Sequence, residues 1–280
     1  MPDNMSKRNF FYKLPPEYRY IARKIYYFPI DFYEKITGKR GKGVPSRGEI
    51  FIGSGDFEKQ GQHQVELLKK YASLKPDDKV LDVGSGIGRT ALALTNYLNT
   101  NGKYEGFDVV KKGVDWCNKN ISNKFPNFNF KFVPLNNELY NSYSEKAVDF
   151  KFPYENEKFQ KVYLFSVFTH MKIEDIKNYI SEIHRVLEKD GICLATFFIY
   201  EKDADLMQFP GFKFPVLKDR YRLIDDKVEE ANIAIEKDYL TEIINETGLE
   251  VVDYVKGFWS DFGLDRNGID FQDIAIMRKV

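Results

Sequence analysis

The sequence predicts an α/β domain built on a largely parallel sheet, preceded by a helical N-terminal cap and interrupted by an inserted lid. Strand-like and helix-like patterns alternate from residue 64 onward, which is typical of a parallel sheet with crossover helices. A glycine-rich loop follows the first strand and leads into a helix. About 15 residues separate the last two strands, too few for a helix, so we expect a closing antiparallel hairpin at the sheet edge.

The elements follow one another in a regular order. Seven runs have the length and composition of strands: 79–84, 103–108, 128–133, 159–166, 192–199, 250–257 and 273–279. Helical patterns lie at 62–73, 89–99, 111–124, 173–187 and 236–247. We assign residues 1–60 to the cap and 61–280 to the domain. Residues 200–235 break the alternation, and because ligands bind beyond the carboxyl ends of such strands, we expect this insertion to cover the site.

Composition excludes several classes of protein. Hydrophobic residues make up 43% of the 280, enough for a sizeable core. The 42 Lys and Arg balance 42 Asp and Glu, so no overall field attracts nucleic acid or an anionic membrane. Cys117 and Cys193 form neither a disulfide framework nor a metal-binding spacing, which favours a cytoplasmic location. The longest apolar runs are far shorter than a membrane span, so no integral membrane association is expected.

The glycine loop VLDVGSGIGRT at 80–90 carries the strongest chemical signal. Its glycines are spaced GxGxG, whereas a dinucleotide fingerprint requires GxGxxG. Asp82, two residues before the loop, would repel a pyrophosphate but suits a ligand that carries an ammonium and a sulfonium. Asp108 ends the next strand 20 residues after Gly88, the distance at which an acid binds both ribose hydroxyls. We therefore expect a cationic ligand with an amino-acid part and a ribose.

These residues resemble motif I of the class I S-adenosylmethionine-dependent methyltransferases. EGFDVV at 105–110 is similar to the ribose-binding strand end of that family, and FQKVYLFSVFTHM at 159–171 to its fourth strand. RVLEKDGICLATFF at 185–198 is similar to the entry into its fifth strand. The resemblance covers about residues 60–200. It implies an enzyme with S-adenosyl-L-methionine as cofactor and a Rossmann-like seven-stranded sheet, parallel with one antiparallel edge strand.

The resemblance also implies a role for each residue around the loop. Asp82 would hold the amino group of the cofactor and Asp108 its ribose hydroxyls, while Val109 would pack on the adenine. Four loop residues would frame the methionine moiety: Gly84, Ser85, Gly86 and Gly88.

Residues after two other strands complete the implied site. Ser166, after the fourth strand, would lie near the reacting end of the cofactor. Many relatives place an acid against the adenine amino group after the third strand, where Leu135 and Asn136 here offer only an amide. Asp190 stands where the family usually has glycine, a departure that concerns a turn and not the cofactor.

The acceptor atom is held by few residues, because methyl transfer is an in-line displacement. A hydroxyl acceptor needs a general base, and His170 follows the fourth strand at the carboxyl edge. The alternative is that His170 caps or packs against the helix that begins near Ile173. His184 falls inside a helix on the packing pattern, and His63 starts the helix before the first strand, where it lines the entrance or faces water.

Missing motifs narrow the chemistry. There is no cluster of acids for a metal, no Pro-Cys pair for cytosine-C5 transfer, and no Asn-Pro-Pro-Tyr tetrapeptide for DNA amino-methylation. O- or N-methylation of a small molecule or saccharide remains, with no DNA partner. The aromatic residues Trp259, Phe258 and Tyr221 could stack on a sugar or pack in a core. A non-catalytic protein that binds S-adenosylmethionine, or an RNA methyltransferase, is the alternative, and the oligomeric state stays open.

The N-terminal fifty residues contain eleven Lys and Arg against five Asp and Glu, a net +6 that leaves −6 in the rest. Tyr20, Ile21, Lys24, Ile25 and Phe28 lie at helical spacing. We expect this stripe to pack on the α/β body, with the cap lying across the acidic remainder. A nucleic-acid-binding arm or an interfacial membrane helix would have a similar sequence. Nearer the first strand, the segment 48–62 would fold over the cofactor, or form a plain turn, at Asp56 and Phe57.

Overall fold

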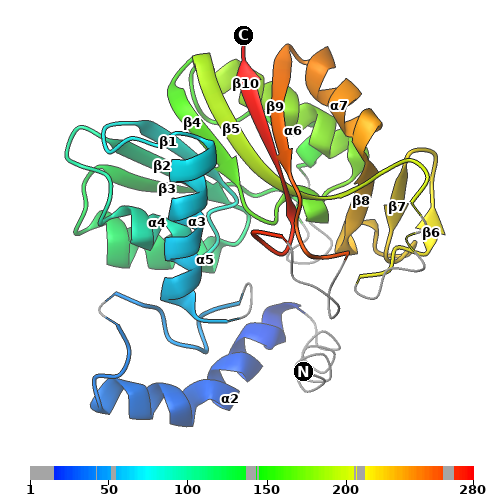
Figure 1. Ribbon diagram of the computed structural model, residues 1–280. Coiled ribbons are helices and arrows are strands. Elements are labelled where there is room, and N and C mark those ends of the chain that lie inside the picture. The colour runs from blue at the N-terminus through cyan, green and yellow to red at the C-terminus, as the bar shows by residue number, and fades with distance from the viewer. Residues whose placement is uncertain are drawn as a thin grey trace.

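The structure, a computed structural model, is a ten-stranded mixed sheet with helices on both faces (Figure 1). It describes residues 16–41, 43–51, 55–136, 143, 145–204, 206, 212–260 and 268–280. The first fifteen residues of the expected cap, and residues 205 and 207–211 of the expected lid, lie outside this set. The α/β fold class is confirmed, whereas the division at residue 60 stays a prediction.

Five parallel strands form the part of the sheet that carries the glycine loop. At their centre lies β1 (Lys79–Val83), with β2 (Lys103–Asp108) and then β3 (Phe128–Phe132) on one side. On the other side lie β4 (Phe159–Leu164) and β5 (Leu187–Tyr200). Because all five run in the same direction, their carboxyl ends meet at one edge of the sheet.

The antiparallel strand expected at the sheet edge lies inside the sheet. Strand β10 (Asp273–Lys279) pairs with both β5 and β9 (Leu249–Val255), so β9 and not β10 stands at this border. Strand β10 is buried at all but one position, whereas β9 is buried at only one and exposes the charged side chains of Glu250 and Asp253. A charged and exposed strand suits an edge, since charge discourages pairing with another chain.

The insertion at 200–235 forms strands. Strands β6 (Val216–Leu217), β7 (Tyr221–Leu223) and β8 (Ile233–Glu236) form an antiparallel meander, and β8 continues the sheet parallel to the last residues of β5. The sheet therefore has ten strands, three more than the resemblance implied. Runs of two to four residues are too short to show a period in sequence, which is why they were missed.

Helices cover both faces of the sheet (Figure 1). One face carries α3 (Phe57–Tyr71), α4 (Arg89–Leu94) and α5 (Lys111–Cys117), whose last turn continues as a π-helical turn to Ser122. The opposite face carries α6 (Ile173–Val186) and α7 (Lys237–Glu246). None of the helices in the described ranges is both long and apolar enough to cross a membrane.

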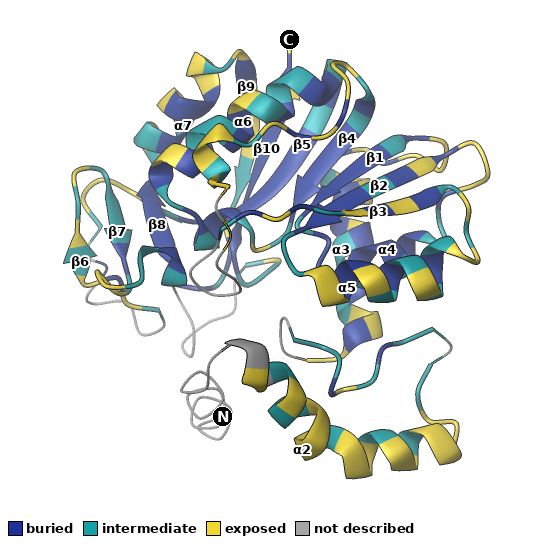
Figure 2. Ribbon diagram, turned by 180° about the vertical axis from the view of Figure 1, so that it is seen from behind, coloured by how far each residue is buried: buried dark blue, intermediate teal, exposed yellow. Residues whose placement is uncertain are grey.

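The N-terminal helix α2 (Pro16–Ile36) lies beyond the carboxyl edge of the sheet, and its apolar stripe does not pack on the body (Figures 1 and 2). Ile21, Ile25 and Phe28 are 55%, 70% and 64% exposed, so the expected packing is wrong. The physical reason lies on the other side of the helix. Asp31 accepts hydrogen bonds from the backbone N–H groups of Arg47 and Gly48, which turns the polar face inward.

Candidate functional site

The glycine loop follows β1 at the carboxyl edge and leaves no room for side chains. Gly84, Gly86 and Gly88 have φ values of +81°, +57° and +74°, in the left-handed region that glycine adopts without strain. A Cβ on Gly84 would lie 2.5 Å from a methyl carbon of Val167, and one on Gly88 2.8 Å from Cys117 Sγ. The hydroxyl of Ser85 is buried with no hydrogen-bond partner in the structure. The loop therefore exposes backbone groups at close range to a ligand.

Asp82 lies beneath the loop with two tyrosine partners that the sequence analysis missed. Its Oδ2 accepts hydrogen bonds from the hydroxyls of Tyr104, at 2.7 Å, and Tyr163, at 2.9 Å. Burial raises the pKa of Asp82 to about 7, against the lowering by the two tyrosines, and the nearby Asp108 raises it further. Gly106, the register partner of Asp82 on β2, makes room, since a Cβ there would meet the Tyr104 hydroxyl at 2.9 Å.

Asp108 connects the loop to the end of β2. Its Oδ2 accepts the backbone N–H of Gly86 and its Oδ1 that of Val110, each at 2.7 Å. Burial raises the pKa of Asp108 to about 6, although these backbone hydrogen bonds lower it. Each carboxylate oxygen keeps a second lone pair that can accept a ligand hydroxyl. Two poorly solvated carboxyl groups thus lie within one small region, which favours a cationic ligand.

The residues expected at the adenine differ in how far their side chains are buried. Val109 follows Asp108 and is half-buried against the core. Asn136 is half-buried, and its backbone N–H donates to the carbonyl of Glu145. Leu135 is 1% exposed and packs inside the core cluster that includes Phe107. Its side chain therefore belongs to the core, although β3 brings its backbone to the correct edge.

Ser166 joins the ends of three strands. Its backbone N–H donates to Thr196 Oγ1 of β5 at 2.7 Å, and its hydroxyl donates to Gln272 Oε1, next to β10, at 2.8 Å. Gln272 Nε2 is 3.4 Å from Thr169 Oγ1, a long contact. Ser166 has a φ of +59°, which is strained for a residue other than glycine. Such strain persists only where neighbours hold it, and it is concentrated at functional sites.

His170 ends the 3₁₀ turn that follows β4. Its Nδ1 is 3.2 Å from the carbonyl oxygen of Glu230. Because a carbonyl only accepts, Nδ1 carries the proton in this contact, and Nε2 of the neutral ring has the basic lone pair. Of the other two histidines, His63 has its Nε2 3.7 Å from Oδ2 of Asp270. Burial lowers the pKa of His184, which lies on α6. The role of His170 as a general base stays a prediction.

Trp259 packs in the hydrophobic core. It is 1% exposed, packs edge-on against Phe198 and Phe214, and donates its Nε1–H to Asp273 Oδ2 at 2.6 Å. Asp273 also accepts the backbone N–H groups of Ile199 and Gly257. This buried carboxylate, which the sequence analysis missed, ties β10 to the end of β5. The core alternative therefore holds for Trp259, and a buried ring of this kind has no face for a sugar.

The segment before α3 contributes a cap and a buried arginine contact. Asp56 is the N-cap of α3 and accepts the backbone N–H of Lys59 at 2.9 Å, so the turn alternative holds for this residue. Phe57 is buried, and the guanidinium carbon of Arg89 lies 5.5 Å from the centre of its ring. Burial lowers the pKa of Arg89, a missed residue that directly follows the glycine loop.

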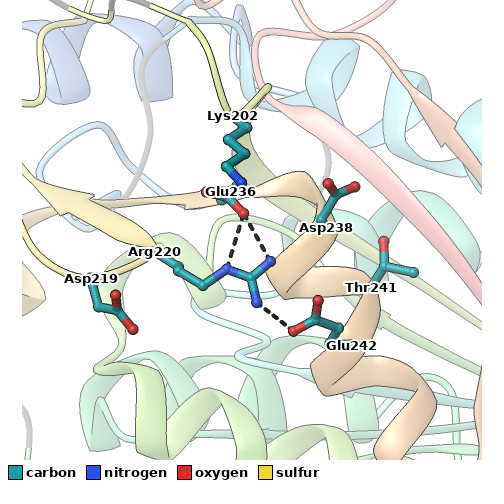
Figure 3. Close-up of a pocket in the computed structure, with 7 residues that line it drawn as sticks. All are labelled: Lys202, Asp219, Arg220, Glu236, Asp238, Thr241 and Glu242. Carbon is teal, nitrogen blue, oxygen red and sulfur yellow. Dashed lines mark hydrogen bonds and ion pairs between the residues drawn. The ribbon is translucent and has the colours of Figure 1, made fainter.

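A concave region lies between the insertion and α7, and none of the residues that line it belongs to the glycine loop (Figure 3). Arg220 pairs there with Glu236, at 2.8 Å, and with Glu242. The positive charge of Arg220 is therefore balanced within the protein. Within the described ranges, no group of three or more His, Cys, Asp or Glu side chains is arranged to hold a metal ion. The glycine loop with its two acids remains the strongest candidate site.

Comparisons with known proteins identify relatives of this site. A family model described as a methyltransferase domain matches residues 74–248. The ubiquinone/menaquinone biosynthesis C-methyltransferase UbiE of Wigglesworthia glossinidia brevipalpis is 29% identical over 123 residues, which are 42% of this chain and 48% of that protein. The match therefore spans about half the length of this relative.

Solved structures share the fold at low sequence identity. A putative sarcosine dimethylglycine methyltransferase from Galdieria sulphuraria has a TM-score of 0.54 and 13% identity, covering 89% of this chain and 95% of that one. The 1,6-didemethyltoxoflavin-N1-methyltransferase of Burkholderia thailandensis, with bound 1,6-didemethyltoxoflavin and S-adenosylhomocysteine, has a TM-score of 0.50 and 13% identity. It covers 95% of this chain and 91% of that one.

Proposed function

This chain belongs to the class I S-adenosylmethionine-dependent methyltransferases, and we propose that it methylates an oxygen or nitrogen atom of a small molecule or saccharide. The observation that carries the proposal is the left-handed glycine loop above two buried, poorly solvated acids. The didemethyltoxoflavin enzyme, whose structure holds a small heterocycle, supports the small-molecule class. The name of the UbiE relative makes carbon the alternative acceptor atom.

The residues at the loop fit S-adenosylmethionine. A ligand with an ammonium and a sulfonium would favour the ionised form of Asp82 and Asp108, whose pKa values are raised mainly by burial. We assign Asp82 to the amino group, Asp108 to the ribose hydroxyls and Val109 to the adenine. The unpaired hydroxyl of Ser85 is a donor and acceptor for the amino-acid part. Arg89, half-buried beside the loop, has the charge that a ligand carboxylate requires.

The chemistry needs positioning and one proton acceptor. When bound, the cofactor would supply an electrophilic methyl group, whose carbon atom an acceptor atom would attack on the side opposite the leaving sulfur. We assign His170 as the general base, because its Nδ1–H is fixed on the Glu230 carbonyl and Nε2 is the basic atom. Ser166 positions the end of β4 through Thr196 and Gln272. We place the acceptor at the carboxyl edge, between these groups and the loop.

Calorimetric titration with S-adenosylmethionine and S-adenosylhomocysteine tests the site. We expect Asp108→Ala to abolish binding, whereas Asp115→Ala, which removes an exposed carboxylate of α5 paired with Lys111, should leave it unchanged. Absence of binding by the unaltered chain would refute both the methyltransferase and the non-catalytic alternative.

A labelled-methyl assay on fractionated cell extract tests the acceptor class. Separate small-molecule, glycan, lipid, protein and RNA pools are incubated with the enzyme, and we expect label in the small-molecule or glycan pool. With a carbon-13 methyl label, the chemical shift of the transferred methyl group in nuclear magnetic resonance distinguishes O-, N- and C-methyl products. Binding without label in any pool would favour the non-catalytic alternative, and label in the RNA pool would favour an RNA methyltransferase.

A further inference from the structure

The exposed face of α2 is the largest feature that the methyltransferase site does not explain. Nine of its described apolar side chains are between 43% and 70% exposed: Tyr18, Ile21, Ile25, Tyr26, Phe28, Ile30, Phe32, Tyr33 and Ile36. We call these residues the α2 face. At 100° per residue, Ile21, Ile25, Phe28, Phe32 and Ile36 form one continuous stripe along the helix. Monomeric soluble proteins rarely expose so many neighbouring apolar side chains, so the α2 face requires an occupant.

The polar side of α2 is already used within the protein. Asp31 binds the backbone of Arg47 and Gly48, and Glu34 forms an ion pair with Arg47 at 2.6 Å. On the same side, Tyr20 is half-buried. Its ring makes a cation–π contact with Lys112 of α5, whose Nζ is 4.4 Å from the ring centre. These contacts fix the rotation of the helix. The α2 face therefore points away from the protein, as the exposed colouring of the helix shows (Figure 2).

The charges around the α2 face are one-sided. Two of the three acids of the helix, Asp31 and Glu34, are held on the inner side. Lys35 and Lys39 are exposed at the end of α2 and just after it, whereas Lys24 pairs with Glu49 within the cap. Basic side chains beside an aromatic and aliphatic surface complement anionic lipid headgroups, and tyrosine rings with polar hydroxyls suit the boundary between headgroups and acyl chains.

The width of the α2 face favours a flat partner, such as a membrane surface, over a second helix. Measured around the helix axis from Phe28 to Ile30, the apolar arc of the α2 face spans about 200°, which is wider than the narrow seam of a two-helix coiled coil. Pro29 removes a backbone donor inside the helix, and α2 bends (Figure 1). Two copies meeting through this surface would also bring their exposed lysines together, which disfavours a dimer.

We propose that α2 is an interfacial helix that binds this protein to an anionic lipid bilayer. The helix lies in the plane of the headgroups with the α2 face in the acyl boundary and the lysines on the phosphates. Since α2 lies beyond the carboxyl edge of the sheet (Figure 1), docking places this edge, which carries the glycine loop, on the membrane side of the protein. The inference is independent of the acceptor proposed above.

Vesicle flotation of the full chain tests the proposal. The probes are phosphatidylcholine vesicles and the same vesicles with about 30% phosphatidylglycerol. We expect the protein to float with the anionic vesicles, and the bound fraction to fall in high salt. The double substitution Ile25→Glu and Phe28→Glu should weaken partitioning by about a hundredfold, since two large apolar side chains no longer enter the bilayer. Lys35→Glu with Lys39→Glu should weaken binding to anionic vesicles more than to neutral ones.

The matched control is Leu217→Glu with Val252→Glu, which places the same charges on exposed apolar residues of β6 and β9. It should float like the unaltered protein. Calorimetric binding of S-adenosylhomocysteine should be the same in every variant, which shows that each one is folded. Absence of flotation, or equal flotation of the α2 double variant, would overturn the proposal. Sedimentation without lipid gives a further test. A dimer that the α2 substitutions dissociate would also overturn the proposal, because the α2 face would then be the contact between two copies of the chain.

Discussion

Replacement of Asp82 by asparagine should change how the stability of the ligand-free protein depends on pH. The carboxyl group is 4% exposed and its pKa is raised from 3.8 to about 7. A group whose pKa is higher in the folded state stabilises that state at low pH, and the stabilisation is lost as pH rises through the folded pKa. For this group, the loss in the free energy of unfolding between pH 5 and pH 8 is about 3 kcal/mol.

Asp82→Asn keeps an oxygen that accepts the hydroxyls of Tyr104 and Tyr163 but removes the titration. Urea unfolding at pH 5, 6, 7 and 8 measures the free energy for both proteins. We expect the difference between variant and unaltered protein to shift by about 3 kcal/mol in favour of the variant over this range. Asp115→Asn, at an exposed carboxylate, is the control and should give a constant difference.

Parallel stability curves for Asp82→Asn and the unaltered protein would refute the reasoning, since they would show that burial does not raise the pKa of Asp82 in solution. A second measurement links the titration to the cofactor. Saturating S-adenosylmethionine should flatten the curve of the unaltered protein, because a bound cation favours the ionised carboxylate.

Other expected outcomes concern the cofactor, the base and the loop. Affinity for S-adenosylmethionine should fall about tenfold from pH 8 to pH 6 as Asp82 becomes protonated, and a pH-independent affinity in calorimetry would contradict this assignment. His170→Ala should lower turnover on the true acceptor and leave cofactor affinity within a few-fold, so unchanged turnover would remove its role as base. Gly84→Ala should lower the free energy of unfolding by about 1–3 kcal/mol, since its Cβ would lie 2.5 Å from a valine methyl carbon. Gly38→Ala, also at positive φ but with nothing within 4 Å, should cost less in the same measurement.

Local signals in the sequence were sufficient for the central sheet and for the loop. The run VLDVGSGIG predicts strand β1 and the turn after it, because apolar strand residues and glycines with positive φ are local requirements. The longer helices α3, α6 and α7 also bury residues at helical spacing. These features depend on neighbours in the chain, which is why they could be derived from it.

Partners from distant strands were not predictable in this way. Tyr163 lies opposite Asp82 only because β4 pairs with β1 in one register, and a single sequence does not fix that register. The position of β10 inside the sheet likewise depends on two pairings at once. The predicted orientation of α2 is wrong because an amphipathic pattern shows that a helix has an apolar face but does not show what covers that face.

The location of charge connects the cap to the site. The net charge of zero is the sum of +6 in the first fifty residues and −6 in the remainder. We expected the acidic body to neutralise the cap, but the ion pairs of Arg47 with Glu34 and of Lys24 with Glu49 join residues within the cap. Asp82 and Asp108 are buried, and their hydrogen-bond partners are tyrosine hydroxyls and backbone N–H groups. The cap therefore keeps its positive charge for an anionic surface, while the site keeps its negative charge for a cationic cofactor.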